Sequence, residues 1–122
     1  MSVYSYRDLN VWKLSIELVQ DIYEVTQRFP KEELYGLVSQ LRRAAVSVPA
    51  NIAEGQQRDS TKDYLRHVAI SLGSLAEVRT LLEISQRLHF LKRERGSELD
   101  AKAERIGRMI RALQKSLKKK LP

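Results

Sequence analysis

The chain has 122 residues, enough for one domain, and its 43% hydrophobic and 30% charged residues are ordinary for a soluble globular protein. It contains no cysteine, which excludes disulfides, thiolate nucleophiles and thiolate metal sites. No apolar run approaches the roughly 18 residues of a membrane span, and residues 1–8 lack a signal-peptide pattern. We therefore expect a cytoplasmic protein without a membrane partner.

The net charge of +7 is confined to one end of the sequence. Residues 1–91 contain eleven Lys or Arg and eleven Asp or Glu, whereas residues 92–122 contain eleven and four. Such a concentration of positive charge is typical of a segment that binds a polyanion. It is also typical of a solvated tail that improves solubility.

Apolar residues recur with helical spacing in four segments, which predicts helices at roughly residues 6–28, 31–57, 60–88 and 95–118, with a start near Arg93 as the alternative for the last. The helix starts carry capping or proline signals: Ser5 with Asp8, Pro30, Asp59 or Ser60 with Asp63, and Ser97 with Asp100. Pro49 should bend the second helix. We expect an all-α protein, with residues 1–122 forming one up-down-up-down four-helix bundle that ends in a short basic tail.

The helix predicted at residues 6–28 has two apolar stripes. One comprises Leu9, Trp12, Ile16, Val19 and Tyr23, and the other comprises Val11, Leu14, Leu18, Ile22, Val25 and Phe29. A helix on the outside of a monomeric bundle needs only one apolar face. We therefore expect the second face to contact another subunit; the alternative is a first helix enclosed by its own bundle.

A basic ridge follows the outer face of the helix predicted at residues 95–118. The candidate nucleic-acid-binding residues are Arg105, Arg108, Arg111, Lys115, Lys118 and Lys119. The first five recur at spacings of 3, 3, 4 and 3, so that they form a straight line about 20 Å long. Phosphate groups could follow this line without base-specific contacts. The alternative is a solvated face.

A narrow polar stripe runs along the helix predicted at residues 31–57. Its members are Gln40, Arg43, Ser47, Asn51 and Glu54, and Arg58 continues the spacing. Because buried polar groups must be satisfied, we favour a network that fixes the register between helices or between subunits. The alternative is a groove for a ligand or a partner.

No residue pattern predicts catalysis or a resident cofactor. His67 and His89 have no glutamate three residues before them, as a di-iron bundle would require, and neither has a second histidine nearby for a metal site. No glycine-rich phosphate loop is present. We expect no enzyme, no metal and no cofactor.

Several segments closely resemble the four-helix bundle proteins encoded in intervening sequences of bacterial 23S ribosomal RNA genes, the S23-like family. They are QLRRAAVSVPANIAEG at residues 40–55, YRDLNVW at 6–12, FPKEELYGL at 29–37 and GSLAE at 73–77. The resemblance implies a four-helix bundle that assembles as a ring-like homopentamer without catalytic residues. It also implies a distant relation to the accessory protein of diversity-generating retroelements, which partners a reverse transcriptase and binds nucleic acid.

Two functions follow from these patterns. The first is a non-enzymatic homo-oligomer, pentameric by the resemblance, that binds RNA or DNA with little sequence preference. The second is a protein-interaction scaffold that docks a partner such as a nucleic-acid enzyme, with the charge serving solubility.

Overall fold

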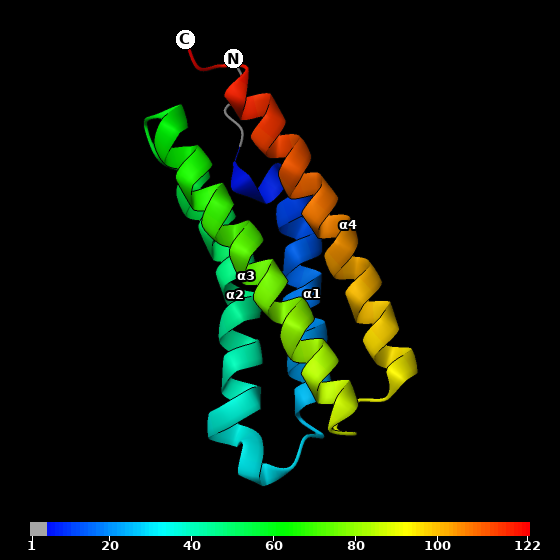
Figure 1. Ribbon diagram of the computed structural model, residues 1–122. Coiled ribbons are helices and arrows are strands. Elements are labelled where there is room, and N and C mark those ends of the chain that lie inside the picture. The colour runs from blue at the N-terminus through cyan, green and yellow to red at the C-terminus, as the bar shows by residue number, and fades with distance from the viewer. Residues whose placement is uncertain (1–4) are drawn as a thin grey trace.

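The computed structural model describes residues 5–122, which form an all-α, up-down-up-down four-helix bundle as predicted (Figure 1). The long helices are α1 (Asn10–Thr26), α2 (Ser39–Gln56), α3 (Thr61–Arg87) and α4 (Arg93–Lys118). Three short segments precede α1 and α2: η1 (Tyr6–Asp8), η2 (Lys31–Glu33) and η3 (Leu34–Val38). No strand occurs within residues 5–122. Residues 1–4, which the signal-peptide prediction also concerned, lie outside the described residues.

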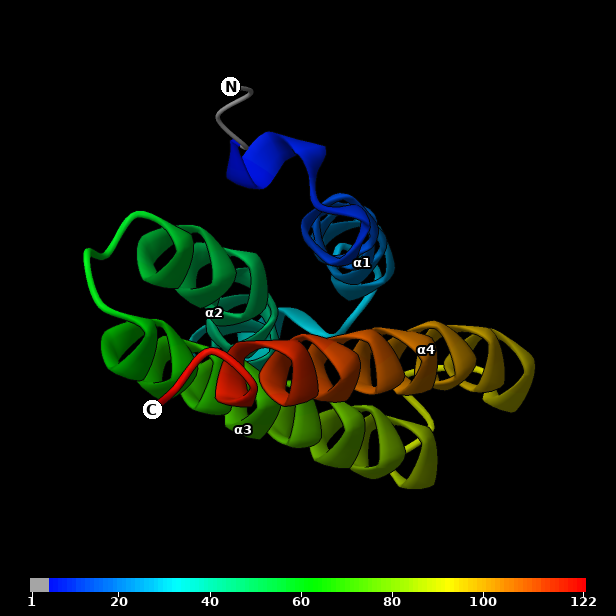
Figure 2. The ribbon, with the colours of Figure 1, turned by 90° about the horizontal axis from the view of Figure 1, so that it is seen from above.

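The helices surround one hydrophobic core. Seen along the bundle, α1 and α2 lie on one side and α3 and α4 on the other (Figure 2). The most extensive packing joins α2 to α3. The largest wholly buried apolar side chains come from all four helices: Leu18, Ile22, Leu41, Ile52, Leu82, Leu99, Ile106 and Ile110. Burial of such side chains is the main favourable contribution to folding.

The prediction of one continuous helix over residues 6–28 is wrong. The capping box of Ser5 and Asp8 is present, but it closes only the 3₁₀ turn η1. Leu9 then has extended backbone (φ −75°, ψ 123°), which separates η1 from α1. The turn places the Tyr6 ring edge-on against Trp12, with 5.3 Å between the ring centroids. Tyr6 therefore packs against α1 from a separate turn and not from the first turn of the helix.

The second predicted helix is also shorter than expected, because α2 begins at Ser39 rather than near residue 31. Pro30 is the cap of the 3₁₀ turn η2 and not its first residue. The π-helical segment η3 follows, and Gly36 there departs from helical dihedral angles (φ −112°, ψ −107°). α2 then runs through the buried Pro49 without interruption. The irregular backbone therefore lies at Gly36, and glycine permits it because it has no Cβ.

The start of α3 matches the sequence prediction, whereas the cap predicted for the fourth helix is wrong. The Asp63 N–H donates to Ser60 Oγ at 3.0 Å, so Ser60 caps α3. α4 begins at Arg93, the earlier of the two starts considered, so Ser97 and Asp100 lie inside it. Asp100 instead accepts hydrogen bonds from the Arg79 side chain on α3.

Candidate nucleic-acid interface

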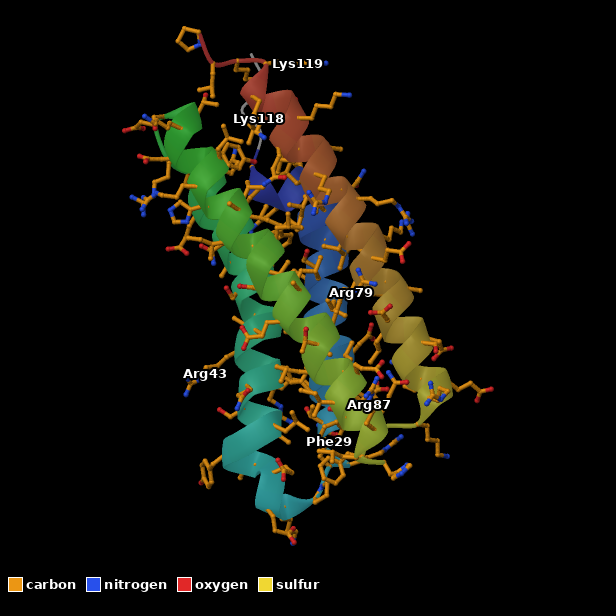
Figure 3. The ribbon with its side chains drawn as sticks, viewed as in Figure 1. Phe29, Arg43, Arg79, Arg87, Lys118 and Lys119 are labelled. Atoms are coloured by element: carbon orange, nitrogen blue, oxygen red, sulfur yellow. The ribbon has the colours of Figure 1, made fainter. Side chains whose placement is uncertain are left out.

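The basic ridge lies on the solvent face of the C-terminal half of α4. All six candidate residues are exposed, whereas Ile106, Ile110 and Leu117 on the opposite face are buried. Lys118 and Lys119 mark the end of the ridge in Figure 3, at the end of the bundle away from Phe29. The amphipathic spacing of α4 therefore separates the core-facing residues from the ridge, as the sequence predicted.

Most cations of the ridge have no anionic partner. Arg108 donates to Glu104 at 2.6 Å, but Arg105, Arg111, Lys115, Lys118 and Lys119 form no ion pair within residues 5–122. Four of the candidates, Arg111, Lys115, Lys118 and Lys119, line a shallow hollow of about 470 Å³ together with Gln114. The carbonyl end of α4 stabilises positive charge in its last turn. The ridge thus presents fixed positive charge that a phosphate chain could neutralise.

The acidic residues of α4 lie before the ridge and most are held in ion pairs. Arg79 of α3 donates to both oxygens of Asp100 at 2.8 and 3.0 Å. This hydrogen bonding, assisted by the charges of Asp100 and Glu104, raises the pKa of Arg79. Glu98 contacts Arg95 at 3.2 Å. The Arg79–Asp100 pair joins the first half of α4 to α3, whereas the Arg95–Glu98 pair lies within α4. Few carboxylates therefore remain to oppose an approaching polyanion.

α1 and α4 are also joined by opposite charges. The Lys102 ammonium donates to Asp21 at 2.7 Å and lies 3.6 Å from Glu17. Arg95 approaches Asp21 at 3.5 Å. The acidic edge of α1 therefore faces α4, which leaves the remaining outer surface of α1 to its apolar residues.

The polar stripe of α2 divides into a bonded part and an exposed part. The Ser47 hydroxyl pairs with the Ser74 hydroxyl of α3 at 2.7 Å, and Asn51 donates to the Ser47 carbonyl at 3.0 Å. Asn51 Oδ1 lies 3.0 Å from His67 Nδ1 of α3, a buried ring whose Nε2 has no hydrogen-bond partner in the described part of the chain. Ser47 and Asn51 thus join α2 to α3.

The other three residues of the stripe are not brought into this network. Gln40, Arg43 and Glu54 are exposed, and their side chains have no hydrogen bond or ion pair with any residue from 5 to 122. Arg43 points away from the bundle (Figure 3). The residues that α3 contributes to the network were not predicted. The helical spacing of His67, Ser71 and Ser74 is the pattern from which they could have been predicted.

An open groove of about 710 Å³ lies along the outer side of α2. Arg43, Ser47 and Asn51 of the polar stripe are among the residues that line it, as the alternative interpretation of the stripe would require. Exposed apolar side chains line it, among them Leu34, Tyr35 and Val46, and the Tyr35 side chain is 93% exposed. Arg42 lies over the Tyr23 ring of α1 at 4.4 Å and donates to the Thr26 hydroxyl at 3.0 Å. Arg42 thus connects the groove to α1.

The two apolar stripes of α1 differ in burial. Val11, Leu18, Ile22, Val25 and Phe29 of one stripe are buried in the core, with Leu14 half-buried. In the other stripe Leu9, Trp12, Ile16 and Val19 are only half-buried, and Tyr23 is exposed. Leu9, Trp12 and Val19 of this second stripe still pack against the edge of the core, so the bundle covers one stripe fully and the other in part.

Within residues 5–122 no group of three or more His, Cys, Asp or Glu side chains is placed to hold a metal ion. The same residues include no helix that is long and apolar enough to cross a membrane.

Comparison with known proteins adds a family and a structural relative. The profile of the 23S rRNA-intervening sequence protein family matches residues 7–112. No curated protein matches the sequence. A crystal structure of a protein of unknown function from the S23 ribosomal protein family of Bacteroides thetaiotaomicron is similar, with a TM-score of 0.78 and 23% identity. The similarity covers 86% of this chain and 98% of that one, and it supports the bundle fold.

Proposed function

The chain belongs to the 23S rRNA-intervening sequence protein family, and on that premise we propose that it is a homo-oligomeric nucleic-acid-binding accessory protein that catalyses no reaction. The observation that carries this proposal is the charge of the C-terminal segment. Residues 105–122 contain seven Lys or Arg and no Asp or Glu. The six candidate residues among them are all exposed. The proposed site of action is the cytoplasm.

The proposed binding mode is sequence-tolerant. The cations of the ridge would contact phosphates and release condensed counterions, so affinity would depend steeply on salt. Residues 93–122 contain no aromatic residue, which argues against base stacking as a source of affinity. RNA and duplex DNA are both candidate ligands.

The half-buried stripe of α1 is the proposed contact between subunits. Its half-buried side chains include Trp12 and Ile16, and its exposed member Tyr23 lines the groove of α2. Covering this surface with a second copy would remove apolar area from water. The resemblance implies five subunits, and we adopt the pentamer as the proposed assembly.

Fluorescence anisotropy with labelled structured RNA and labelled duplex DNA, titrated at several salt concentrations, tests the ridge. The test variant carries Arg105→Gln, Arg108→Gln, Arg111→Gln and Lys115→Gln. We expect weaker binding and a log–log salt slope that is shallower by about 3 to 4, since each lost phosphate contact reduces the slope by about 0.9. Light scattering in the same buffer should show an unchanged oligomer.

A matched control changes four exposed cations elsewhere, namely Lys31, Arg58, Lys62 and Arg66, to glutamine. Arg66 has an ion-pair partner on its own helix, Asp63 at 3.8 Å, as Arg108 has Glu104. The control therefore matches the test variant in net charge and in ion pairing. Equal losses in the two variants would show that net charge and not the ridge governs binding, and an unaffected test variant would exclude the ridge.

The groove of α2 favours a second candidate function, a scaffold that docks a protein partner such as a nucleic-acid enzyme. Tyr35 and Val46 expose apolar surface beside Arg43. Tyrosine and arginine are enriched in protein interfaces. The test is a pull-down after nuclease treatment. A single protein retained by the native chain and lost with Tyr35→Ser and Arg43→Ala would favour this function over nucleic-acid binding.

A further inference from the structure

A second pocket lies at the corner where α3 ends and α4 begins, and it is separate from the ridge. Its volume is about 540 Å³, within the range of small-molecule sites. It occupies the end of the bundle where Phe29 and Arg87 are labelled in Figure 3, whereas Lys118 and Lys119 lie at the other end. Arg93 and Lys118 are separated by 25 residues of α4, or about 37 Å.

The charge of this corner pocket is positive and largely uncompensated. Arg28, Lys92, Arg93 and Arg95 line it, and no carboxylate does. Arg95 is neutralised by Asp21 and Glu98. The side chains of Arg28, Lys92 and Arg93 have neither an ion pair nor a hydrogen bond with any described residue. Three cations that share one hollow without a counter-charge favour the binding of an anion.

Backbone N–H groups at the start of α4 also favour an anion in this pocket. Lys92 is the cap of α4 and cannot accept a hydrogen bond through its side chain. The N–H groups of Arg93, Glu94 and Arg95 consequently have no acceptor among residues 5–122. By contrast, Ser60 supplies a side-chain acceptor at the start of α3. An oxyanion in the pocket would be attracted by the positive end of the α4 dipole as well as by the cations.

His89 lines the same pocket from an unusual backbone conformation (φ 64°). The Phe90 N–H donates to the Ser85 carbonyl and the His89 N–H to the Gln86 carbonyl, at 2.9 and 3.0 Å. This is the hydrogen-bond pattern with which helices end on a left-handed residue, usually glycine. The chain has histidine there instead, and its imidazole adds a polar group to the pocket.

One wall of the pocket is apolar. Val25, Phe90 and Leu91 form it, and the Phe90 ring packs against Phe29 with 5.8 Å between the centroids. A ligand that fills the pocket would therefore combine an anionic group with an apolar or aromatic part. Three uncompensated cations favour a phosphomonoester over a carboxylate, because it carries nearly two negative charges at neutral pH.

We propose that the corner pocket of Arg28, His89, Lys92 and Arg93 binds a small phosphomonoester with an aromatic or apolar substituent, such as a nucleoside 5′-monophosphate. The two arginines offer planar pairs of donors to the phosphate oxygens. Phe90 offers a surface for the substituent. This site goes beyond the proposed function and does not depend on the ridge.

Isothermal titration calorimetry of the full chain at constant ionic strength tests the proposal. The probes are adenosine 5′-monophosphate, inorganic phosphate and adenosine. We expect the nucleotide to bind at least tenfold more tightly than either of the other two. Lys92→Gln with Arg93→Gln should weaken nucleotide binding at least tenfold, and both positions are exposed, so folding should persist.

The matched control is Lys118→Gln with Lys119→Gln, which removes the same charge from the other end of α4. Its nucleotide affinity should stay within twofold of the native value. The absence of binding at millimolar nucleotide would refute the site. So would an equal loss in the control, or adenosine binding as tightly as the nucleotide. Because the control lies in the ridge, failure of this pocket and failure of the proposed nucleic-acid interface give different results.

Discussion

His89 combines an unfavourable backbone with a position in the corner pocket. A left-handed conformation costs a non-glycine residue about 1 to 2 kcal/mol, and such costs tend to persist where a side chain has a function. The sequence predicted a helix end at residue 88, but it did not predict the left-handed conformation of His89. The conformation follows from the hydrogen bonds of Phe90 and His89 to the last turn of α3.

Replacing His89 by glycine should stabilise the protein. His89→Gly removes the unfavourable contact of Cβ in the left-handed region, and the exposed side chain contributes little packing. We expect a gain of about 1 kcal/mol and a melting temperature higher by about 3 to 6 °C, measured by circular dichroism. His89→Ala keeps Cβ and should give no gain; equal melting temperatures for the two variants would contradict the explanation.

Replacement by alanine should change the free energy of unfolding in opposite directions at two glycines. A Cβ at Gly55 would lie 2.9 Å from His67 Cβ and from Tyr64 Cδ1, where α2 and α3 approach closely. A Cβ at Gly73 would meet nothing within 4 Å. Gly55→Ala should lower the free energy of unfolding by about 1 kcal/mol or more, because overpacking exceeds the gain in helix propensity. Gly73→Ala should raise it by about 1 kcal/mol.

Urea denaturation of both variants checks these signs. Two stabilised variants would show that α2 and α3 separate easily at Gly55. A Gly73→Ala variant with a smaller mass by light scattering would instead place Gly73 in a contact between subunits.

At the scale of the element, α1 has more apolar surface than its bundle covers. The acidic edge of the helix faces Lys102 and Arg95 of α4, and the core covers the stripe that contains Leu18 and Ile22. The stripe with Trp12 and Ile16 remains only half-buried. The chain therefore buries one stripe in its core and covers the other only in part.

A charge in this outer stripe should dissociate the proposed oligomer without unfolding the chain. Ile16→Glu would place a carboxylate in an apolar contact between subunits, where an unpaired charge is costly. We expect the mass from light scattering to fall to that of one chain, 14.1 kDa, with helical circular dichroism retained. Asn10→Glu, an exposed position on the polar side of the same helix, is the matched control and should leave the mass unchanged. A folded Ile16→Glu protein of unaltered mass would exclude this stripe as the interface.

α4 has two halves with different environments. Its first half contains Asp100 and Lys102, which bind α3 and α1. The second half directs its basic residues to solvent. The spacing of the basic residues was enough to predict the ridge, because helical geometry alone fixes which residues share a face. It did not show that Asp100 pairs with Arg79, because that contact depends on how α3 lies against α4.

At the scale of the whole molecule, the two positive regions occupy opposite ends of the bundle. The ridge lies at the end that contains η1, and the corner pocket lies at the end where α3 turns into α4 (Figure 1). Their separation lets each be altered without the other. In a ring of identical subunits the ridges would be repeated, so a long nucleic acid could contact several of them at once.

Dissociation of the oligomer should therefore weaken nucleic-acid binding even though the ridge is intact. Contacts through several linked sites raise the apparent affinity by about 10²- to 10⁴-fold when the geometry permits them. We expect the Ile16→Glu protein to lose at least about tenfold in affinity for a long RNA, by anisotropy. A ligand short enough to contact one ridge should bind the native and variant proteins alike. Equal affinities for the long RNA would contradict a shared contact.

The sequence by itself determined the number and approximate extent of the helices, the bundle topology and the line of the basic ridge. These follow from local periodicity and from short connections, which do not depend on distant contacts. The tertiary structure decided the extended residue between η1 and α1, the late start of α2 and the pairing of Asp100 with Arg79. It also decided that Ser47 pairs with Ser74 and Asn51 with His67 while Arg43 stays in solvent, and that Arg28 meets Lys92 and Arg93 in one pocket. Each of these depends on the packing of segments far apart in the chain, which periodicity along one helix does not specify.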